Sequence, residues 1–130
     1  MERLSPLSQG LTGTFDATYL AGLKSIVSYV TSKGGYAIID PHNFGRYNGG
    51  VISNAANFGI WCRNLATQFK GSSRVIFDTN NEYHDMDQQL VFDLNQQCIN
   101  GIRAAGATSQ LILVEGNAWT GAWTWQVPLR

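Results

Sequence analysis

The chain has 130 residues, no net charge at neutral pH and 14% charged residues. This length predicts one domain, with a core that removes roughly two thirds of the unfolded surface from water. Because Lys and Arg form no cluster and no apolar run approaches the roughly twenty residues that span a bilayer, we expect no nucleic-acid partner and no membrane association.

Residues 1–13 read as a loop, because Pro6, Gly10 and Gly13 interrupt them. They contain no basic start followed by an apolar segment, so we expect no signal peptide within the chain. A helix is predicted to begin beside Asp16. Its apolar residues recur at helical spacing, and two glycines at positions 34 and 35 end it.

Three short apolar runs predict parallel strands, at residues 36–40, 75–80 and 111–114. Their near-continuous apolar character is typical of strands buried on both faces. A glycine-rich loop follows the first strand, and helical patterns at about 57–69 and 87–105 lie between the strands. This order predicts an α/β fold that is part of a (β/α)8 TIM barrel, with three parallel strands and intervening helices.

The two cysteines, Cys62 and Cys98, lie 36 residues apart without a nearby Cys or His partner. This spacing excludes a zinc finger but permits one disulfide. Cys98 falls on the apolar stripe of the helix predicted at 87–105, so we expect it to be a buried free thiol.

Polar side chains follow each predicted strand: Asp40 and His42, Asn81 and Glu82, and Glu115 and Asn117. In a barrel of this kind, the C-terminal ends of the strands carry the active site. Glu82 beside Asn81 suits a general acid/base next to an amide that fixes a ligand hydroxyl. The structural alternatives are that Glu82 caps the following turn and that His42 closes its loop.

A metal site is a competing interpretation of the same strand ends. Asp40, His42 and Glu82, supported by His84 and Asp85, would hold an ion that activates water. Their spacing is poor for this role, because no second histidine follows the same strand as His42.

Three tryptophans follow the last predicted strand, at positions 119, 123 and 125. An indole face packs well against the apolar face of a sugar ring, and a chain with 12% aromatic residues and 14 glycines suits a neutral polar ligand. Tryptophan is more often a core residue. Three within seven residues are not all buried easily, so we expect Trp119 to be exposed as a ligand platform.

Five segments together resemble the fungal endo-β-1,4-glucanases of glycoside hydrolase family 5. They are MERL at 1–4, YAIIDPHNFGRY at 36–47, VIFDTNNEYHDMD at 75–87, GIRAAGATSQ at 101–110 and VEGNAWTGAWTW at 114–125. The likeness covers nearly the whole chain and ends at residues 126–130. It implies a secreted, retaining cellulase on a (β/α)8 barrel that uses neither a metal nor an organic cofactor.

The resemblance also implies roles for individual residues. Glu82 takes the place of the acid/base, Asn81 that of the residue on the sugar 2-hydroxyl, and His42 that of a residue near the cleaved bond. Tyr83 stands where many members carry proline, as a variant of the fungal branch. Further substrate contacts are expected at four positions in addition to the platform Trp119: Asn43, Tyr47, His84 and Asn117. The expected ligand is a β-1,4-glucan, either cellulose or cello-oligosaccharides.

The family places its nucleophilic Glu beyond residue 130 and a further arginine before Met1. We therefore expect residues 1–130 to be a partial catalytic domain without the N-terminal and C-terminal parts of the barrel, and with no nucleophile of its own. Glu115 is not expected to replace the nucleophile. Three strands do not close a barrel, so we expect self-association or pairing with the missing barrel segments. The alternatives are a catalytically silent glucan-binding fragment and the metal-dependent barrel hydrolase.

Overall fold

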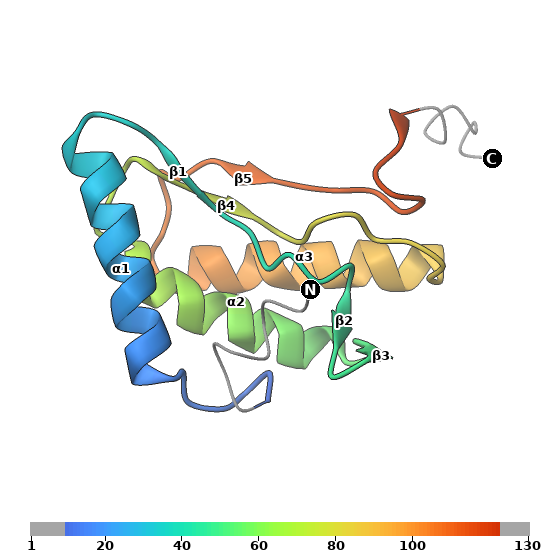
Figure 1. The fold of residues 1–130 in the computed structure, drawn as a ribbon. Helices are drawn as coiled ribbons and strands as arrows, with labels where there is room; N and C mark the ends of the chain where they lie inside the picture. The colour runs from blue at the N-terminus through green and yellow to red at the C-terminus, as the bar shows by residue number, and fades with distance from the viewer. Residues whose placement is uncertain (1–9, 123–130) are drawn as a thin grey trace.

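A computed structural model describes residues 10–122 as alternating helices and strands (Figure 1). The elements in chain order are α1 (Ala17–Ser32), β1 (Ala37–Ile39), β2 (Arg46–Tyr47), β3 (Gly50–Val51), α2 (Ala55–Phe69), β4 (Val75–Asp78), α3 (Gln88–Ala104) and β5 (Ile112–Leu113). The predicted motif at residues 1–4 and the tryptophans at 123 and 125 lie outside the described residues. No helix among residues 10–122 has the length and apolar character that a bilayer crossing requires.

The main sheet confirms the three predicted parallel strands. Its order is β1-β4-β5, with Ile38 paired to Ile76 and Phe77 paired to Ile112. Each strand is shorter than its predicted run. The parallel order places the C-terminal ends of all three strands at one edge, where the polar residues meet.

All three predicted helices are present, and each begins at a polar residue whose side chain accepts a backbone N–H. Asp16 caps α1, Asn54 caps α2 and Asp87 caps α3. These caps satisfy amide donors that have no partner within the helix. Gly106, at a φ of 93°, follows the end of α3 as expected for a glycine that terminates a helix.

Helices α2 and α3 pack side by side under one face of the sheet (Figure 1). Gly59 and Gly101 bring their backbones together, because a Cβ on Gly101 would lie only 2.1 Å from the Gly59 carbonyl oxygen. Large buried side chains of the two helices include Phe58, Trp61 and Leu94. The core of the molecule is therefore the layer formed by these two helices and the covered face of the sheet.

The prediction of a free thiol at Cys98 is wrong. Cys98 on α3 forms a disulfide with Cys62 on α2, with the two Cα atoms 5.2 Å apart. The apolar stripe of α3 faces α2, so the position that indicated a buried thiol also places Cys98 opposite Cys62. No cysteine in the described chain is free.

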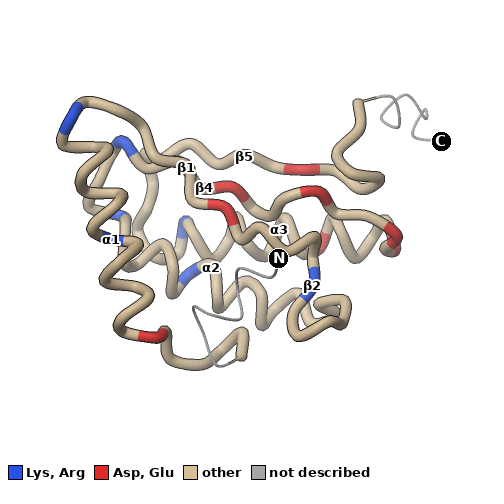
Figure 2. Tube along the Cα trace, viewed as in Figure 1, with Lys and Arg blue, Asp and Glu red and all other residues tan. Residues whose placement is uncertain are grey.

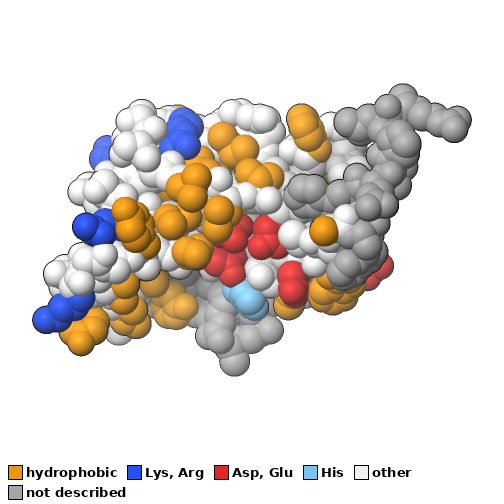
Figure 3. Space-filling model, turned by 90° about the horizontal axis from the view of Figure 1, so that it is seen from above, with side chains coloured by type: hydrophobic (Ala, Val, Ile, Leu, Met, Phe, Trp, Pro, Cys, Tyr) orange, Lys and Arg blue, Asp and Glu red, His pale blue; other side chains and the backbone are white. Residues whose placement is uncertain are grey.

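The prediction that the strands are buried on both faces is also wrong. Ile39, Val75 and Phe77 are buried, whereas Ile38 is 57% exposed. Side chains alternate along a strand, and the second face of the sheet is left open by the elements that the structure describes. Figure 3 shows that face, where hydrophobic side chains gather beside acidic side chains and a histidine. In a closed barrel this is the face that lines the interior.

The glycine-rich loop after β1 contains an unpredicted hairpin. Strands β2 and β3 pair antiparallel, with Tyr47 opposite Gly50. Asn48 and Gly49 form the turn with φ angles of 49° and 77°, the left-handed geometry that an Asn-Gly pair favours in a two-residue hairpin. The Asn-Gly pair is therefore the feature of the sequence that indicates this hairpin.

Candidate active site at the strand ends

The acidic side chains gather where the strands of the main sheet end. Figure 2 shows Asp and Glu on the ends of β1, β4 and β5 and on the loops that follow, while most Lys and Arg lie toward the opposite end of the strands. The edge that carries the sequence-predicted site therefore has a local negative charge, although the chain as a whole is neutral.

His42 is held by Asp40 beyond the end of β1. Its Nδ1 lies 2.7 Å from Oδ2 of Asp40, and its side chain is about half exposed. An N–H on Nδ1 donates to the carboxylate, which leaves Nε2 available to a ligand. Burial raises the pKa of the Asp40 carboxyl, and the hydrogen bond from His42 opposes that rise.

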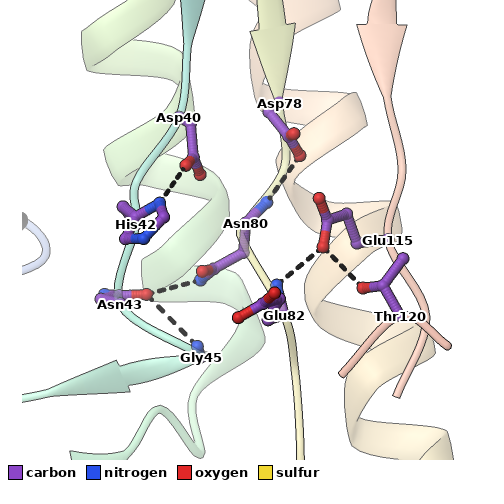
Figure 4. A network of polar contacts seen from close by, with 9 residues as sticks. All are labelled: Asp40, His42, Asn43, Gly45, Asp78, Asn80, Glu82, Glu115 and Thr120. Carbon is purple, nitrogen blue, oxygen red and sulfur yellow. Dashed lines mark hydrogen bonds and ion pairs between the residues drawn. The ribbon is translucent and has the colours of Figure 1, made fainter. Parts of the chain in front are cut away.

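Asn43 belongs to the supporting structure. Its side chain is 1% exposed, and its Oδ1 accepts hydrogen bonds from the Gly45 amide at 3.2 Å and from Nδ2 of Asn80 at 2.7 Å (Figure 4). The Asn43 side chain thus joins the loop after β1 to the loop after β4, and its role as a substrate contact stays a prediction.

Glu82 and Asn81 lie in the loop after β4, and both residues are partly buried. The backbone of Glu82 has a φ of 51°, a left-handed conformation that is uncommon for a residue with a side chain. Its amide donates a hydrogen bond of 2.7 Å to Oε2 of Glu115. The Asn80 side chain joins the same loop to Asn43 in the loop after β1, so the loop after β4 is tied to both of its neighbours.

Glu115 and Asp78 form a carboxyl pair at the ends of β5 and β4. Oε2 of Glu115 also accepts a hydrogen bond of 2.6 Å from the Thr120 hydroxyl, and the two carboxyl groups share a side-chain hydrogen bond. Burial raises the pKa of Asp78 to about 7, and the charge of Glu115 adds to the rise. Asp78 therefore titrates far above the ordinary range of a carboxyl group.

Tyr83, next to Glu82, is fully buried. Gly45 makes room for it, because a Cβ there would lie 2.6 Å from the Tyr83 ring. Burial raises the pKa of the Tyr83 hydroxyl. Tyr83 thus anchors the loop after β4 against the loop after β1.

An aromatic cluster borders the acidic residues. Trp119 is 51% exposed, as predicted, and its indole stacks on His84 with 3.6 Å between ring centroids. Phe44 packs edge-on against Trp119, His84 and His42, at centroid distances from 5.7 to 5.9 Å. The loops after β1, β4 and β5 therefore each contribute to one aromatic surface.

The two remaining predicted contacts make hydrogen bonds within the protein. Nδ2 of Asn117 donates to the Met86 carbonyl at 2.7 Å, which joins the loops after β5 and β4. The Tyr47 hydroxyl accepts a hydrogen bond of 2.7 Å from the Gly10 amide. Both side chains are partly buried, so each remains a prediction as a substrate contact.

Sequence reasoning missed three polar residues of this edge: Asp78, Asn80 and Thr120. Asp78 lies inside the predicted strand, where the two-residue alternation after Phe77 was a signal that it faces away from the helices. Asn80 and Thr120 gain their partners, Asn43 and Glu115, only through the fold. No short motif marks these pairs.

The metal interpretation gains no support from this geometry. Among residues 10–122, no three His, Cys, Asp or Glu side chains come together in a group that could hold a metal ion. Asp40 and His42 are in contact, but Asp85 pairs separately with His84, at 2.8 Å. The predicted ligand set is therefore divided between two contacts.

Comparisons with known proteins agree with this architecture. The family model described as cellulase, glycosyl hydrolase family 5, matches residues 3–127. Endo-beta-1,4-glucanase B of Emericella nidulans is 61% identical over 125 residues, which are 96% of this chain and 37% of that protein. Endoglucanase 3 of Humicola insolens is also 61% identical, over 98% of this chain and 32% of that protein.

Solved structures show the same likeness. Cel5A (EG2) from Hypocrea jecorina superposes with a TM-score of 0.80 at 37% identity, over 84% of this chain and 34% of that chain. XacCel5A in complex with cellopentaose gives a TM-score of 0.86 at 32% identity, over 92% of this chain and 39% of that chain. The chain thus spans about a third of the length of the curated relatives it matches.

Proposed function

This chain belongs to the cellulase family, glycosyl hydrolase family 5, and we propose that it is part of the catalytic domain of an endo-β-1,4-glucanase. In this proposal residues 1–130 supply the strands β1, β4 and β5 of a (β/α)8 barrel. The complete domain hydrolyses internal bonds of cellulose or related β-glucans with retention of configuration. No metal or organic cofactor takes part.

One observation carries the proposal: Glu82, His42 and Trp119 lie on one edge of the sheet, at the C-terminal ends of adjacent strands. The hydrogen bond of Glu82 within residues 10–122 involves its backbone amide, so its carboxyl group is available to a ligand. The edge therefore combines a carboxyl group with an exposed indole and an oriented imidazole, which suits acid/base chemistry on a sugar.

In the proposed mechanism, Glu82 protonates the leaving glycosidic oxygen and then takes a proton from the attacking water. Asn81 holds the sugar 2-hydroxyl, and His42, oriented by Asp40, lies near the cleaved bond. Trp119 supports a glucose ring on its exposed face, with His84 behind it. Tyr47 and Asn117 are further proposed contacts at the border of the site.

A retaining glycosidase also needs a nucleophilic carboxylate about 5 Å from the acid/base. Glu115 does not suit this role, because its carboxylate is engaged by the Glu82 amide, the Thr120 hydroxyl and Asp78. We assign the nucleophile to no residue of this chain. The acid/base half of the site is what these 130 residues contribute.

The proposed ligand is a β-1,4-glucan, and cellopentaose is the ligand in the XacCel5A complex. We also propose an extracellular location. The disulfide between Cys62 and Cys98 supports it, because disulfides persist in oxidising compartments. The open face of the sheet supports either self-association or pairing with further barrel segments.

A segment exchange tests the activity. Residues 3–127 replace the matching segment of Emericella nidulans endo-beta-1,4-glucanase B, and reducing-sugar release from carboxymethyl cellulose is measured. We expect hydrolysis by the chimaera and a loss of roughly 100-fold to 10,000-fold in kcat in its Glu82→Gln variant. Asp93→Asn on α3 is the matched carboxylate-to-amide control, expected to keep full activity.

The outcomes separate the candidate functions. A folded chimaera that binds cellopentaose without hydrolysing cellulose contradicts the enzyme proposal and favours the silent glucan-binding fragment. That second candidate rests on the exposed Trp119 in a chain without an assigned nucleophile. Activity that disappears with a chelator favours the metal-dependent hydrolase.

A further inference from the structure

The carboxyl pair beside Glu82 has no role in the proposed chemistry, although it contacts the backbone of the acid/base directly. Oε2 of Glu115 accepts the Glu82 amide at 2.7 Å and the Thr120 hydroxyl at 2.6 Å. Because Glu82 adopts a left-handed φ of 51°, its conformation depends on such contacts from its surroundings. Glu115 supplies one from the neighbouring strand.

Glu115 is itself held through its backbone. Its carbonyl oxygen accepts a hydrogen bond of 2.8 Å from Nδ2 of Asn95 on α3, and Oδ1 of Asn95 accepts one of 2.6 Å from the Thr79 hydroxyl. Both Asn95 and Thr79 are buried. The backbone of Glu115 is therefore joined to buried hydrogen bonds that run from the end of β4 through α3 to the end of β5.

The second oxygen of Glu115 points toward Asp78 (Figure 4), and the two side chains are hydrogen-bonded. Two carboxyl groups make such a bond only when one of them carries a proton. Burial raises the pKa of Asp78 to about 7, with the charges of Glu115 and Asp40 adding to the rise. Below that pH, Asp78 carries the proton, and the Glu82 amide donates to Oε2 of Glu115.

The surroundings of the pair favour this single proton. Asp40 faces it from β1 and is hydrogen-bonded to His42. Tyr83, whose buried hydroxyl is neutral, faces it from the loop after β4, and α3 contributes the uncharged Asn95. Within the described part of the chain, no Lys or Arg is among the groups that act on Asp78. Loss of the proton from Asp78 therefore leaves three charged carboxylates side by side, with no Lys or Arg among the described residues that act on Asp78.

We propose that Glu115 is a positioning residue, hydrogen-bonded to Asp78, that fixes the backbone of Glu82 and so directs the acid/base toward the substrate. The inference rests on the proposed function for the role of Glu82, but the contact itself exists without substrate. Deprotonation of Asp78 weakens the hydrogen bond between the Glu82 amide and Glu115, because repulsion between the two carboxylates displaces Glu115 from that amide.

Hydrogen exchange of the Glu82 amide in the purified chain tests this directly. Exchange is measured by mass spectrometry at single-residue resolution, as protection factors at about pH 5 and about pH 8.5, on either side of the Asp78 pKa of about 7. We expect the wild-type amide to be protected at the lower pH and at least about tenfold less protected at the higher pH. Amides in α2 and α3 report whether the fold is intact.

Two substitutions at one position separate positioning from a general structural effect. Glu115→Ala removes the acceptor, so the Glu82 amide should lose at least about tenfold in protection at both pH values. Glu115→Gln keeps an oxygen for the Glu82 amide and offers its own N–H₂ to Asp78, so protection should persist and its dependence on pH should fall.

Three results would overturn the proposal: an unprotected Glu82 amide in the wild-type chain, full protection in Glu115→Ala with α2 and α3 intact, or a pH dependence that Glu115→Gln leaves unchanged. Should Glu115→Ala fail to fold, the pH dependence of the wild-type chain and of Glu115→Gln still tests the contact. None of these readouts needs turnover, so they stand apart from the cellulose assay of the chimaera.

Discussion

The rings of His84 and Trp119 stack with 3.6 Å between their centroids and 7° between their planes. The two residues come from different loops, after β4 and after β5, and a hydrogen bond of 2.9 Å from the Trp119 amide to the Tyr83 carbonyl joins the same loops. The indole is thus supported on one face while about half of the residue remains exposed. Because the His84 ring already restricts the indole, the Trp119 side chain loses little conformational freedom when a sugar ring packs against its exposed face.

Trp119→Ala should therefore weaken cellopentaose binding by about tenfold, or about 1.4 kcal/mol. Isothermal titration calorimetry of the purified chain provides the measurement. Phe92→Ala is the matched control, because Phe92 is an exposed aromatic residue on α3 outside the strand-end edge. Equal losses in both variants would show that the platform assignment is incorrect.

Asp78→Asn should change how stability depends on pH. The folded-state pKa of Asp78, about 7, lies above the ordinary value of 3.8, so its stabilising contribution is complete below about pH 4 and is lost as the pH rises through 7. The asparagine variant avoids that loss. We expect its Tm to exceed that of the wild-type chain by at least about 3 °C at about pH 8 and to match it near about pH 4.

Thermal unfolding across this pH range checks the prediction. Asp40 remains in the variant and its pKa is also raised, so a smaller decrease of stability with pH should persist. If the Tm of the wild-type chain and that of Asp78→Asn changed with pH in the same way, the assignment of the titration to Asp78 would be contradicted. Asp93→Asn, which removes a carboxylate from α3, is the control for the change in net charge.

The helices and strands could be predicted from the sequence alone, because they depend on residues that are close together along the chain. Helical spacing and capping residues such as Asp87 indicated the helices, and the apolar runs indicated the strands. The pairs of the site depend on contacts between distant segments, as in Asn43 with Asn80 and Glu115 with Glu82. Local patterns do not encode such pairs, and the same limit explains the wrong prediction for Cys98.

Removing the disulfide should destabilise the helix pair. Cys62 and Cys98 are 36 residues apart, and a loop of that size corresponds to about 3 to 4 kcal/mol of stabilisation in the chain-entropy model. The double variant Cys62→Ala and Cys98→Ala should lose that amount in urea unfolding. A reductant should destabilise the wild-type chain similarly and leave the double variant unchanged; a wild-type chain indifferent to reductant would argue against the disulfide.

The close contact between α2 and α3 leads to a separate prediction for the substitution of Gly101. Gly101→Ala places a Cβ in contact with the Gly59 carbonyl, so the helices must separate, and we expect a loss of about 2 to 4 kcal/mol in the free energy of unfolding. Gly22→Ala on α1 is the control: its Cβ meets nothing within 4 Å, and alanine should stabilise that helix by about 0.5 to 1 kcal/mol. Similar effects at both positions would contradict the close helix crossing.

The open face of the sheet should drive association of the purified chain. Ile38 and Leu111 are 57% and 58% exposed, although apolar side chains on a sheet normally pack against another layer. We expect oligomers in sedimentation velocity and at least about tenfold weaker association when Ile38 and Leu111 are both replaced by Lys. Ile26→Lys on α1 changes an equally exposed apolar residue and should leave association intact. A wild-type chain that sediments as a stable monomer at all concentrations would show that this face needs no partner.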